Sequence, residues 1–308
     1  MGTDIKVRIA NHDDIEGIVE LQKYIYPDHK RDRPFFTWQC FENDNPSILI
    51  VAQEDASIIG MLGIQKIPVT GIIYGGQLSW IVVAEHRRGR GLFANMGRLA
   101  LDCMPDLDLL FIFANKAAIY PCEKTFGMNF IGNMEQLISR YSSSDIYTES
   151  SVAPINITTT FNSISCCEGT ITFLRTEPYR RWRYAKSTVY RYFKVSIPSG
   201  EYAIIKLFDK RGSEQIIGDI VDYECNSSDI SRLHRLFQAA LFELRKMGAT
   251  SVTTWGVPGS QLRLMLGEMG FVQSDHSSSF GIKIFNHKHN YLSDFSRWHL
   301  VQSDASNY

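Results

Sequence analysis

The chain has 308 residues, of which 44% are apolar and 21% are charged, and its formal net charge is −1. This composition is typical of a soluble globular protein, and the length fits two domains of about 150 residues. The sequence shows no basic run, secretory signal, long apolar stretch or cluster of metal-ligand residues. We therefore expect a cytoplasmic protein with no nucleic acid, membrane or metal as a partner.

Apolar spacing predicts a helix, a group of strands and a late crossover in the first half of the chain. In chain order the predicted elements are a helix at 13–26, strands at 48–53, 58–68 and 77–83, a helix at 92–104, a strand at 109–114 and a short helix ending at 126. Strands joined by hairpins and followed by a crossover predict a mixed α/β fold.

A repeated signature indicates that the chain contains two copies of this fold. Pro34-Phe-Phe-Thr-Trp38 and Pro178-Tyr-Arg-Arg-Trp182 share a pattern 144 positions apart (178 − 34). Three further landmarks match at an offset of 143: 99–104 with 242–247, the strand at 109–114 with position 252 onward in the strand at 251–257 (252 − 109), and 126–128 with 269–271. We expect one domain at 1–145 and a second at 154–308, joined by a polar linker.

The segment that suggests chemistry is Arg88-Gly89-Arg90-Gly91, between a predicted strand and a predicted helix. Glycines expose backbone N–H groups, and a helix N-terminus adds a partial positive charge. The segment therefore predicts an anion cradle for a pyrophosphate. A dinucleotide fingerprint also fits, but the acidic residue that it requires after the next strand is replaced by Asn115.

This segment resembles the acyl-CoA loop of the GNAT superfamily of N-acyltransferases, whose pattern is Q/R-x-x-G-x-G/A. The match runs from Arg88 to Phe93, where phenylalanine replaces the small residue. A second stretch, Asn115 to Gly127 with Tyr120 and Lys124, is similar to the family's N-x-x-A…Y-x-K-x-G-F. The resemblance implies that acyl-CoA is bound by Ile81, Val82, Val83, Arg88, Gly89, Arg90, Gly91, Leu92, Phe93 and Asn115.

The resemblance also implies roles in catalysis. Backbone N–H groups of 81–83 would polarise the thioester oxygen, and Tyr120 would protonate the leaving thiolate. A strict count places Cys122 where the family has its tyrosine, but Tyr120-Pro121 is similar to the Tyr-Pro of tandem GNAT proteins. The general base stays open among Glu85, Glu123 and Glu135, with Glu123 as the named candidate.

The second copy lacks the glycine loop. Its equivalent segment, 225–232, contains no glycine, and Ser228 or Asp229 is placed to cap a helix that ends at Met247. A side-chain cap uses the donors that a pyrophosphate would need, so we expect no CoA site there. The second copy would instead complete the acceptor site or only stabilise the first copy.

The whole pattern resembles bacterial tandem-GNAT enzymes that N-acylate dTDP-linked amino sugars. This implies acetyl-CoA or 3-hydroxybutyryl-CoA as donor and an amino-sugar nucleotide as acceptor. The predicted acceptor residues are Trp80, Arg181, Arg183, Tyr184 and Trp255. The same aromatic and basic side chains would equally suit a domain core or an exposed turn. Three alternatives stay open: an antibiotic or peptide amine as acceptor, a non-catalytic acyl-CoA-binding regulator, and assembly as a homodimer.

Overall fold

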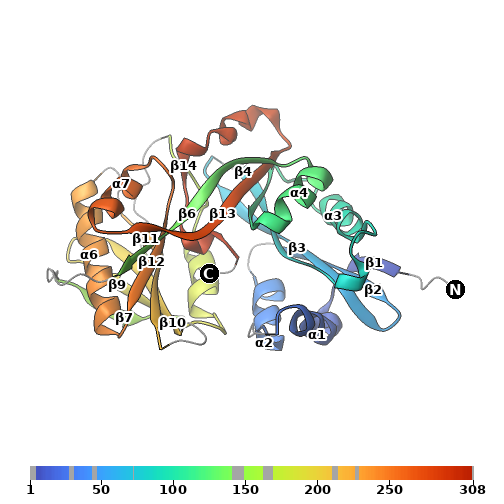
Figure 1. Cartoon of the computed structure of the whole chain (residues 1–308), viewed down its shortest axis with the longest axis horizontal. Helices are drawn as coiled ribbons and strands as arrows, with labels where there is room; N and C mark the ends of the chain where they lie inside the picture. Colours follow the sequence, from blue (N-terminus) through green and yellow to red (C-terminus); the bar gives the residue numbers. More distant parts are fainter. Residues whose placement is uncertain are drawn as a thin grey trace. The chain divides into compact units, whose positions relative to one another are not determined.

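The chain forms two compact units (Figure 1). Unit 1 consists of Met1–Ile131, Ser187–Val189 and Phe280–Ser293, and unit 2 of Gly132–Lys186, Tyr190–Ser279 and Asp294–Tyr308. The structure, a computed structural model, describes residues 5–27, 31–43, 47–71, 73–140, 149–161, 169–209, 214–225 and 229–306.

Unit 1 is built on a mixed sheet in which one strand pair, β4 and β5, runs parallel. The pairs β1–β2, β2–β3 and β3–β4 are antiparallel. The strands are β1 (Ile5–Ile9), β2 (Ser47–Glu54), β3 (Ser57–Val69), β4 (Ile73–Val83), β5 (Leu109–Ala114) and the last part of β13 (Val272–Ile284), which is the neighbour of β5. A parallel pair needs a crossover connection, and α3 provides it, as the sequence predicts.

Helices lie on both sides of this sheet: in Figure 1, α1 and α2 lie on one side of β3, and α3 and α4 on the other. Both α1 and α3 contact β3. The helices of unit 1 are α1 (Ile15–Ile25), α2 (Arg33–Phe36) with the π-helix η2 (Thr37–Phe41), α3 (Leu92–Asp102) and α4 (Lys116–Phe126). Ile15, Ile18, Val19 and Leu21 of α1 are buried, which confirms the amphipathic helix predicted there.

Unit 2 repeats this plan. Its strand order is β6-β12-β11-β10-β9-β7, with β11 and β12 parallel. The strands are β6 (Asn129–Arg140), β7 (Ser151–Pro154), β9 (Tyr192–Ser196), β10 (Tyr202–Asp209), β11 (Ile216–Glu224) and β12 (Ser251–Gly256), beside a small sheet of β8 (Ile171–Thr172) and β14 (Trp298–His299). The helices are α5 (Glu177–Arg180) with the π-helix η4 (Arg181–Ala185), α6 (Ile230–Lys246) and α7 (Gln261–Glu268). Leu236, Phe237 and Leu244 of α6 are fully buried in the core.

The duplication is visible in local detail. In each copy a four-residue α-helix leads directly into a five-residue π-helix. Asp32 caps the first of these helices and Thr176 caps the second, and Trp38 and Trp182 are both buried. In each copy an α-helix connects two parallel strands: α3 connects β4 to β5, and α6 connects β11 to β12. The predicted fold class, two tandem copies of a mixed α/β fold, is confirmed.

The two units do not coincide with two continuous halves of the chain. Unit 1 ends within β6, after Ile131, and it takes up Phe280–Ser293 from the C-terminal part of the sequence. The predicted linker falls largely on 141–148, which lies outside the described residues. The adjacent cysteines Cys166 and Cys167 lie outside them as well. The domain limits 1–145 and 154–308 therefore stay a prediction.

Unit 2 buries a cluster of charged side chains around the C-terminal segment. Arg175 donates to both carboxylate oxygens of Asp304, at 2.9 and 2.7 Å, and its guanidinium lies 3.7 Å from Asp222. Gln302 and Ser303 are at most 1% exposed. Buried charges need partners, and Asp304 of the C-terminal segment finds its partner in Arg175. This ion pair holds the segment up to Ala305 in the core of unit 2.

His299 beside this cluster should make stability depend on pH. Burial, aided by the positive charge of Arg175, lowers the pKa of His299 from 6.5 to about 4. Between these values the unfolded chain binds a proton that the folded chain rejects, so stability should fall as the pH falls from 6.5 to 4. The expected loss is about 3 kcal/mol at most, since one pKa unit corresponds to about 1.4 kcal/mol.

Chemical denaturation at pH 7 and pH 4.5 measures this loss. The variant His299→Gln has no proton to bind, so its stability should change less between the two pH values than that of the wild type. Identical changes in both proteins would show that His299 does not contribute.

Candidate functional site

The predicted anion cradle lies between β4 and α3 and has the backbone geometry that such a site requires. Gly89 and Gly91 have φ values of 75° and 77°, in the left-handed region that favours glycine. A Cβ at either position would meet no atom within 4 Å. Both glycines are exposed. The backbone of the loop is therefore accessible, and a side chain at either glycine would occupy the space in front of it.

The first turn of α3 leaves its N–H donors without a side-chain cap. Gly91 occupies the N-cap position, where it cannot cap with a side chain. By contrast, Asn115 caps α4 by accepting from the N–H of Ala118 at 3.1 Å. Uncapped N–H groups and the helix dipole together favour an anion. The residues present thus fit the pyrophosphate of an acyl-CoA.

The arginines of the loop differ in their partners and in their exposure to solvent. Arg87 is tied to Glu54 by a hydrogen bond of 2.9 Å. Arg88 is exposed and donates to the carbonyl oxygen of Val83 at 3.1 Å. Arg90 is exposed as well. Arg88 and Arg90 are therefore the two arginines of the loop that a phosphate in solvent can reach.

β4 separates from β5 beside this loop. The parallel register covers three pairs and ends at Gln77 and Phe111, so the described residues show no pairing of the two strands beyond that point. The register of β4 with β3 also shifts between Ser79 and Val82, which is a β-bulge. Alternate N–H groups of an extended strand point away from its paired neighbour. We therefore expect such donors within 81–83, on the side of β4 that faces away from β3.

Trp80 in the bulge has a φ of 51°, an uncommon value for a large side chain. Its indole packs over Gly63 of β3: a Cβ at Gly63 would lie 2.3 Å from Cε3 of Trp80. The indole is 7% exposed. The absence of a side chain at Gly63 thus makes room for a strained conformation next to the strand separation.

Gly63→Ala should displace the indole of Trp80. We expect the free energy of unfolding to fall by about 1–3 kcal/mol, as overpacking in cores does, and the tryptophan fluorescence to change. Gly60→Ala in the same strand is the matched control, because its Cβ would meet the flexible end of Met96 at 3.2 Å. Equal effects of the two substitutions would contradict the special fit between Gly63 and Trp80.

Three predicted CoA contacts have structural partners. The ring of Phe93 packs edge-on against Phe126, with 5.5 Å between centres, so the phenylalanine that departs from the family pattern joins α3 to α4. Leu92 is 5% exposed and packs in the core. Asn115 uses its side chain as the cap of α4. Their roles in binding CoA stay predictions, with backbone groups as the available contacts.

The predicted catalytic side chains lie on α4. Tyr120 is 67% exposed, and the ammonium of Lys124 lies 5.9 Å from its ring centre. Glu123 is also exposed. Cys122, the alternative to Tyr120, is fully buried, and burial raises the pKa of its thiol to about 12. Tyr120 is thus the accessible acid of the two. Of the other candidate bases, Glu135 is paired with Arg263 at 2.7 Å.

The predicted acceptor residues other than Trp80 belong to unit 2, and most are engaged there. Arg181 is exposed and pairs with Glu177 at 2.7 Å. Arg183 is buried and donates to the carbonyl oxygen of Ala305 at 2.7 Å. Tyr184 is buried and donates to Asp222 at 2.9 Å. The structure therefore places Arg183 and Tyr184 in the interior of unit 2, with structural partners.

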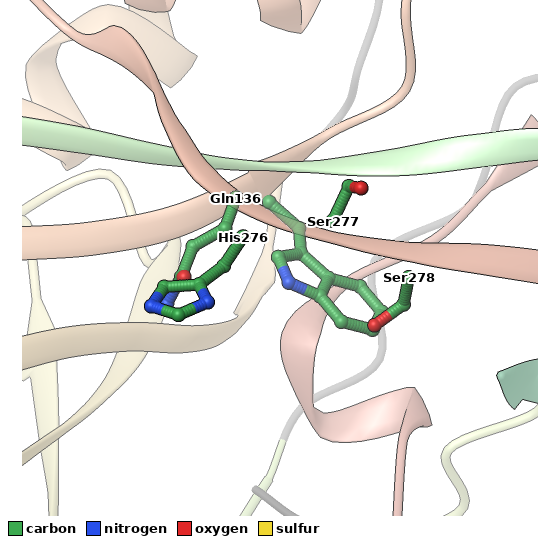
Figure 2. A pocket seen from close by; sticks show the side chains of 5 residues that line it. Gln136, His276, Ser277 and Ser278 are labelled. Atoms are coloured by element: carbon green, nitrogen blue, oxygen red, sulfur yellow. The ribbon is translucent and has the colours of Figure 1, made fainter. Parts of the chain in front are cut away.

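Trp255 helps to line a polar pocket in unit 2 (Figure 2). Gln136 lies directly opposite Trp255 on the adjacent strand, donates to Thr253 at 3.4 Å and accepts from Ser274 at 3.3 Å. The pocket has a volume of about 340 Å³ and is lined by Gln136, Trp255, His276, Ser277 and Ser278. Figure 2 shows Gln136 and His276 toward one side and Ser278 toward the other. Such a lining suits a ligand with hydroxyl or amide groups.

The second copy starts its crossover helix in another way. Asp229 caps α6 by accepting from the N–H of Arg232 at 3.0 Å, which confirms the predicted side-chain cap. The preceding segment, 226–228, lies outside the described residues. Because the cap occupies a donor of the first turn, α6 is less suited to an anion than α3.

Comparison with protein-family models finds a match within the first copy. Residues 15–128 match the model of the acetyltransferase (GNAT) family. This range contains β4, the glycine loop, α3 and Tyr120. A comparison with curated proteins finds no match.

Solved structures with a similar fold cover nearly the whole chain. One is a GCN5-related N-acetyltransferase from Anabaena variabilis, with 13% identity and a TM-score of 0.65 over 92% of this chain and 74% of that one. Another is a tandem GNAT protein from the clavulanic acid biosynthesis pathway, with 12% identity and a TM-score of 0.59 over 91% and 98%. A third is Saccharomyces cerevisiae N-myristoyltransferase with bound myristoyl-CoA, with 8% identity and a TM-score of 0.59 over 92% and 83%. The fold is therefore that of tandem GNAT proteins.

Within the described part of the chain, no group of three or more His, Cys, Asp or Glu residues is placed to hold a metal ion. No helix in the same part is long and apolar enough to cross a membrane.

Several features were not found from the sequence. They include the bulge at Trp80 and the buried polar side chains Gln65, Gln77 and Ser79 on β3 and β4. The sequence could have indicated these polar residues, because Gln65, Gln77 and Ser79 interrupt strands that are mostly apolar.

Proposed function

We propose that the protein is an N-acyltransferase that takes its acyl group from acyl-CoA, bound in the first copy. The observation that carries the proposal is the open, uncapped loop at Gly89 and Gly91 beside the separation of β4 from β5. The match of 15–128 to the GNAT family supports it.

Each part of the first copy has a role in this proposal. The N–H groups at the start of α3, with Arg88 and Arg90, hold the pyrophosphate. The N–H groups of 81–83 that face the gap polarise the thioester oxygen, which acyl-CoA supplies. Tyr120 protonates the departing thiolate, and Glu123 is the proposed base for the amine.

For the acceptor we propose the amino group of a dTDP-linked amino deoxysugar. Retention of a second copy that caps its own crossover helix supports a large acceptor, since a small amine needs one domain only. The polar pocket at Trp255 and Gln136 and the exposed Arg181 offer groups that suit a sugar and a diphosphate.

Mass analysis of products tests the acceptor. The protein is offered dTDP-3-amino-3,6-dideoxyhexoses with acetyl-CoA and with 3-hydroxybutyryl-CoA, and we expect one acylated sugar nucleotide. An aminoglycoside and a peptide amine are offered in parallel. Turnover of either one, with no acylated sugar nucleotide, would refute the acceptor assignment and leave acyl transfer from CoA in place.

A further inference from the structure

Two neighbouring strands of unit 1 each carry a buried polar atom that has no hydrogen-bond partner in the described part of the chain. Gln65 of β3 is 2% exposed and its Nε2 makes no hydrogen bond; Ser79 of β4 is 3% exposed and its Oγ makes none. Buried donors are almost always satisfied, because leaving one unpaired costs about 1–3 kcal/mol. These two atoms therefore call for a partner that the folded chain does not supply.

The two side chains lie on the same patch of sheet. Gln65 is directly opposite Gln77, and Ser79 follows Gln77 by two residues, so all three side chains point to one face. Ser79 is directly opposite Gly63, which carries no side chain. The ring of Trp80 occupies the space over Gly63 and forms a wall beside this polar patch.

The patch adjoins the place where acyl transfer would occur. Gln77 forms the last parallel pair with β5, and Ser79 is the first residue of the bulge beyond it. The backbone donors proposed for the thioester, 81–83, follow within four residues. A group bound to Ser79 would therefore lie next to the gap between the strands.

The second copy fills the equivalent place with its own charges. Lys206 lies opposite Asp219 there, as Gln65 lies opposite Gln77, and Asp219 lies opposite Thr253 at the end of the parallel register. The ammonium of Lys206 is 3.5 Å from Asp219, and Thr253 donates to the same carboxylate. The corresponding pair in unit 1 is uncharged, which suits a neutral ligand group.

We propose that Gln65 and Ser79 bind the acceptor, by hydrogen bonds to a neutral oxygen next to the amine that is acylated. This inference rests on the proposed acyltransferase function and names two residues that determine acceptor specificity. Gln65 Nε2 donates, and Ser79 Oγ either donates or accepts, so the matching ligand group is a hydroxyl, ether or carbonyl oxygen. A sugar hydroxyl vicinal to an amino group has this chemistry.

The test uses Gln65→Met and Ser79→Ala in the full chain. Each substitution removes a buried atom that is unpaired without acceptor, Nε2 of Gln65 or Oγ of Ser79, so the melting temperature should not fall. The acceptor KM should rise about tenfold, and the Kd of acetyl-CoA should stay unchanged. Gln22→Met is the matched control, because Gln22 Nε2 is also buried and unpaired but lies on α1.

The outcomes separate the two proposals. Kinetics are measured with whichever amine of the panel is acylated, so turnover of a non-sugar amine refutes the sugar nucleotide but still tests Gln65 and Ser79. An unchanged KM in both variants, or the same rise in Gln22→Met, would overturn the inference alone. A protein that acylates no amine would overturn the inference together with the proposed function.

Discussion

Replacing Gly91 by valine should abolish the binding of acyl-CoA. The φ of 77° at Gly91 is costly for a β-branched residue, and the new side chain would fill the open space in front of the α3 donors. Titration calorimetry with acetyl-CoA should show one site per chain in the wild type and at least a hundredfold weaker binding in Gly91→Val, about 2.7 kcal/mol.

A second glycine separates lost binding from lost folding. Gly259 of unit 2 has a φ of 79° and also has no atom within 4 Å of a Cβ, so Gly259→Val should cost similar backbone strain. We expect this variant to bind acetyl-CoA like the wild type. Undiminished binding by Gly91→Val, or two equivalent sites in the wild type, would contradict a single site at the glycine loop.

Removal of the hydroxyl group in Tyr120→Phe should lower kcat by ~10²-fold, the size expected when a general acid is lost. The Kd of acetyl-CoA should stay within twofold, roughly, because the substitution leaves the loop and α3 untouched. Pre-steady-state measurement of thiol release isolates the chemical step from product release.

Tyr24→Phe is the matched control, since Tyr24 is equally exposed, at 67%, but lies on α1. Its kcat should match that of the wild type. If Tyr120→Phe keeps full activity when the chemical step limits the rate, Tyr120 is a surface residue and another group protonates the thiolate.

The sequence was sufficient to predict the fold class, because the duplication repeats local signals. The Pro-aromatic-x-x-Trp signature marks the same α-helix and π-helix pair in both copies, and apolar periodicity marks the helices at 13–26 and 92–104. The left-handed backbone of the glycine loop was also predictable, because glycine is the residue that adopts this conformation most readily. Asp229 was predicted as a cap from its residue type and position.

Other features depend on long-range packing that sequence patterns do not contain. Phe93 was assigned to CoA by its place in the loop pattern, whereas its ring packs on Phe126, a residue 33 positions away (126 − 93). Arg183 was predicted as an acceptor residue, but it is buried and donates to the carbonyl oxygen of Ala305. The assignment of Phe280–Ile284 to unit 1 likewise has no local signature in the sequence.

Release of free thiol from acyl-CoA tests the central claim most directly. The full chain is incubated with acetyl-CoA or 3-hydroxybutyryl-CoA and a panel of amino-sugar nucleotides, aminoglycosides and peptide amines. The account predicts thiol release that requires both an acyl-CoA and an amine, with an amine product heavier by one acyl group. Binding of acyl-CoA without thiol release in the presence of any amine would contradict it and would indicate a non-catalytic acyl-CoA-binding protein.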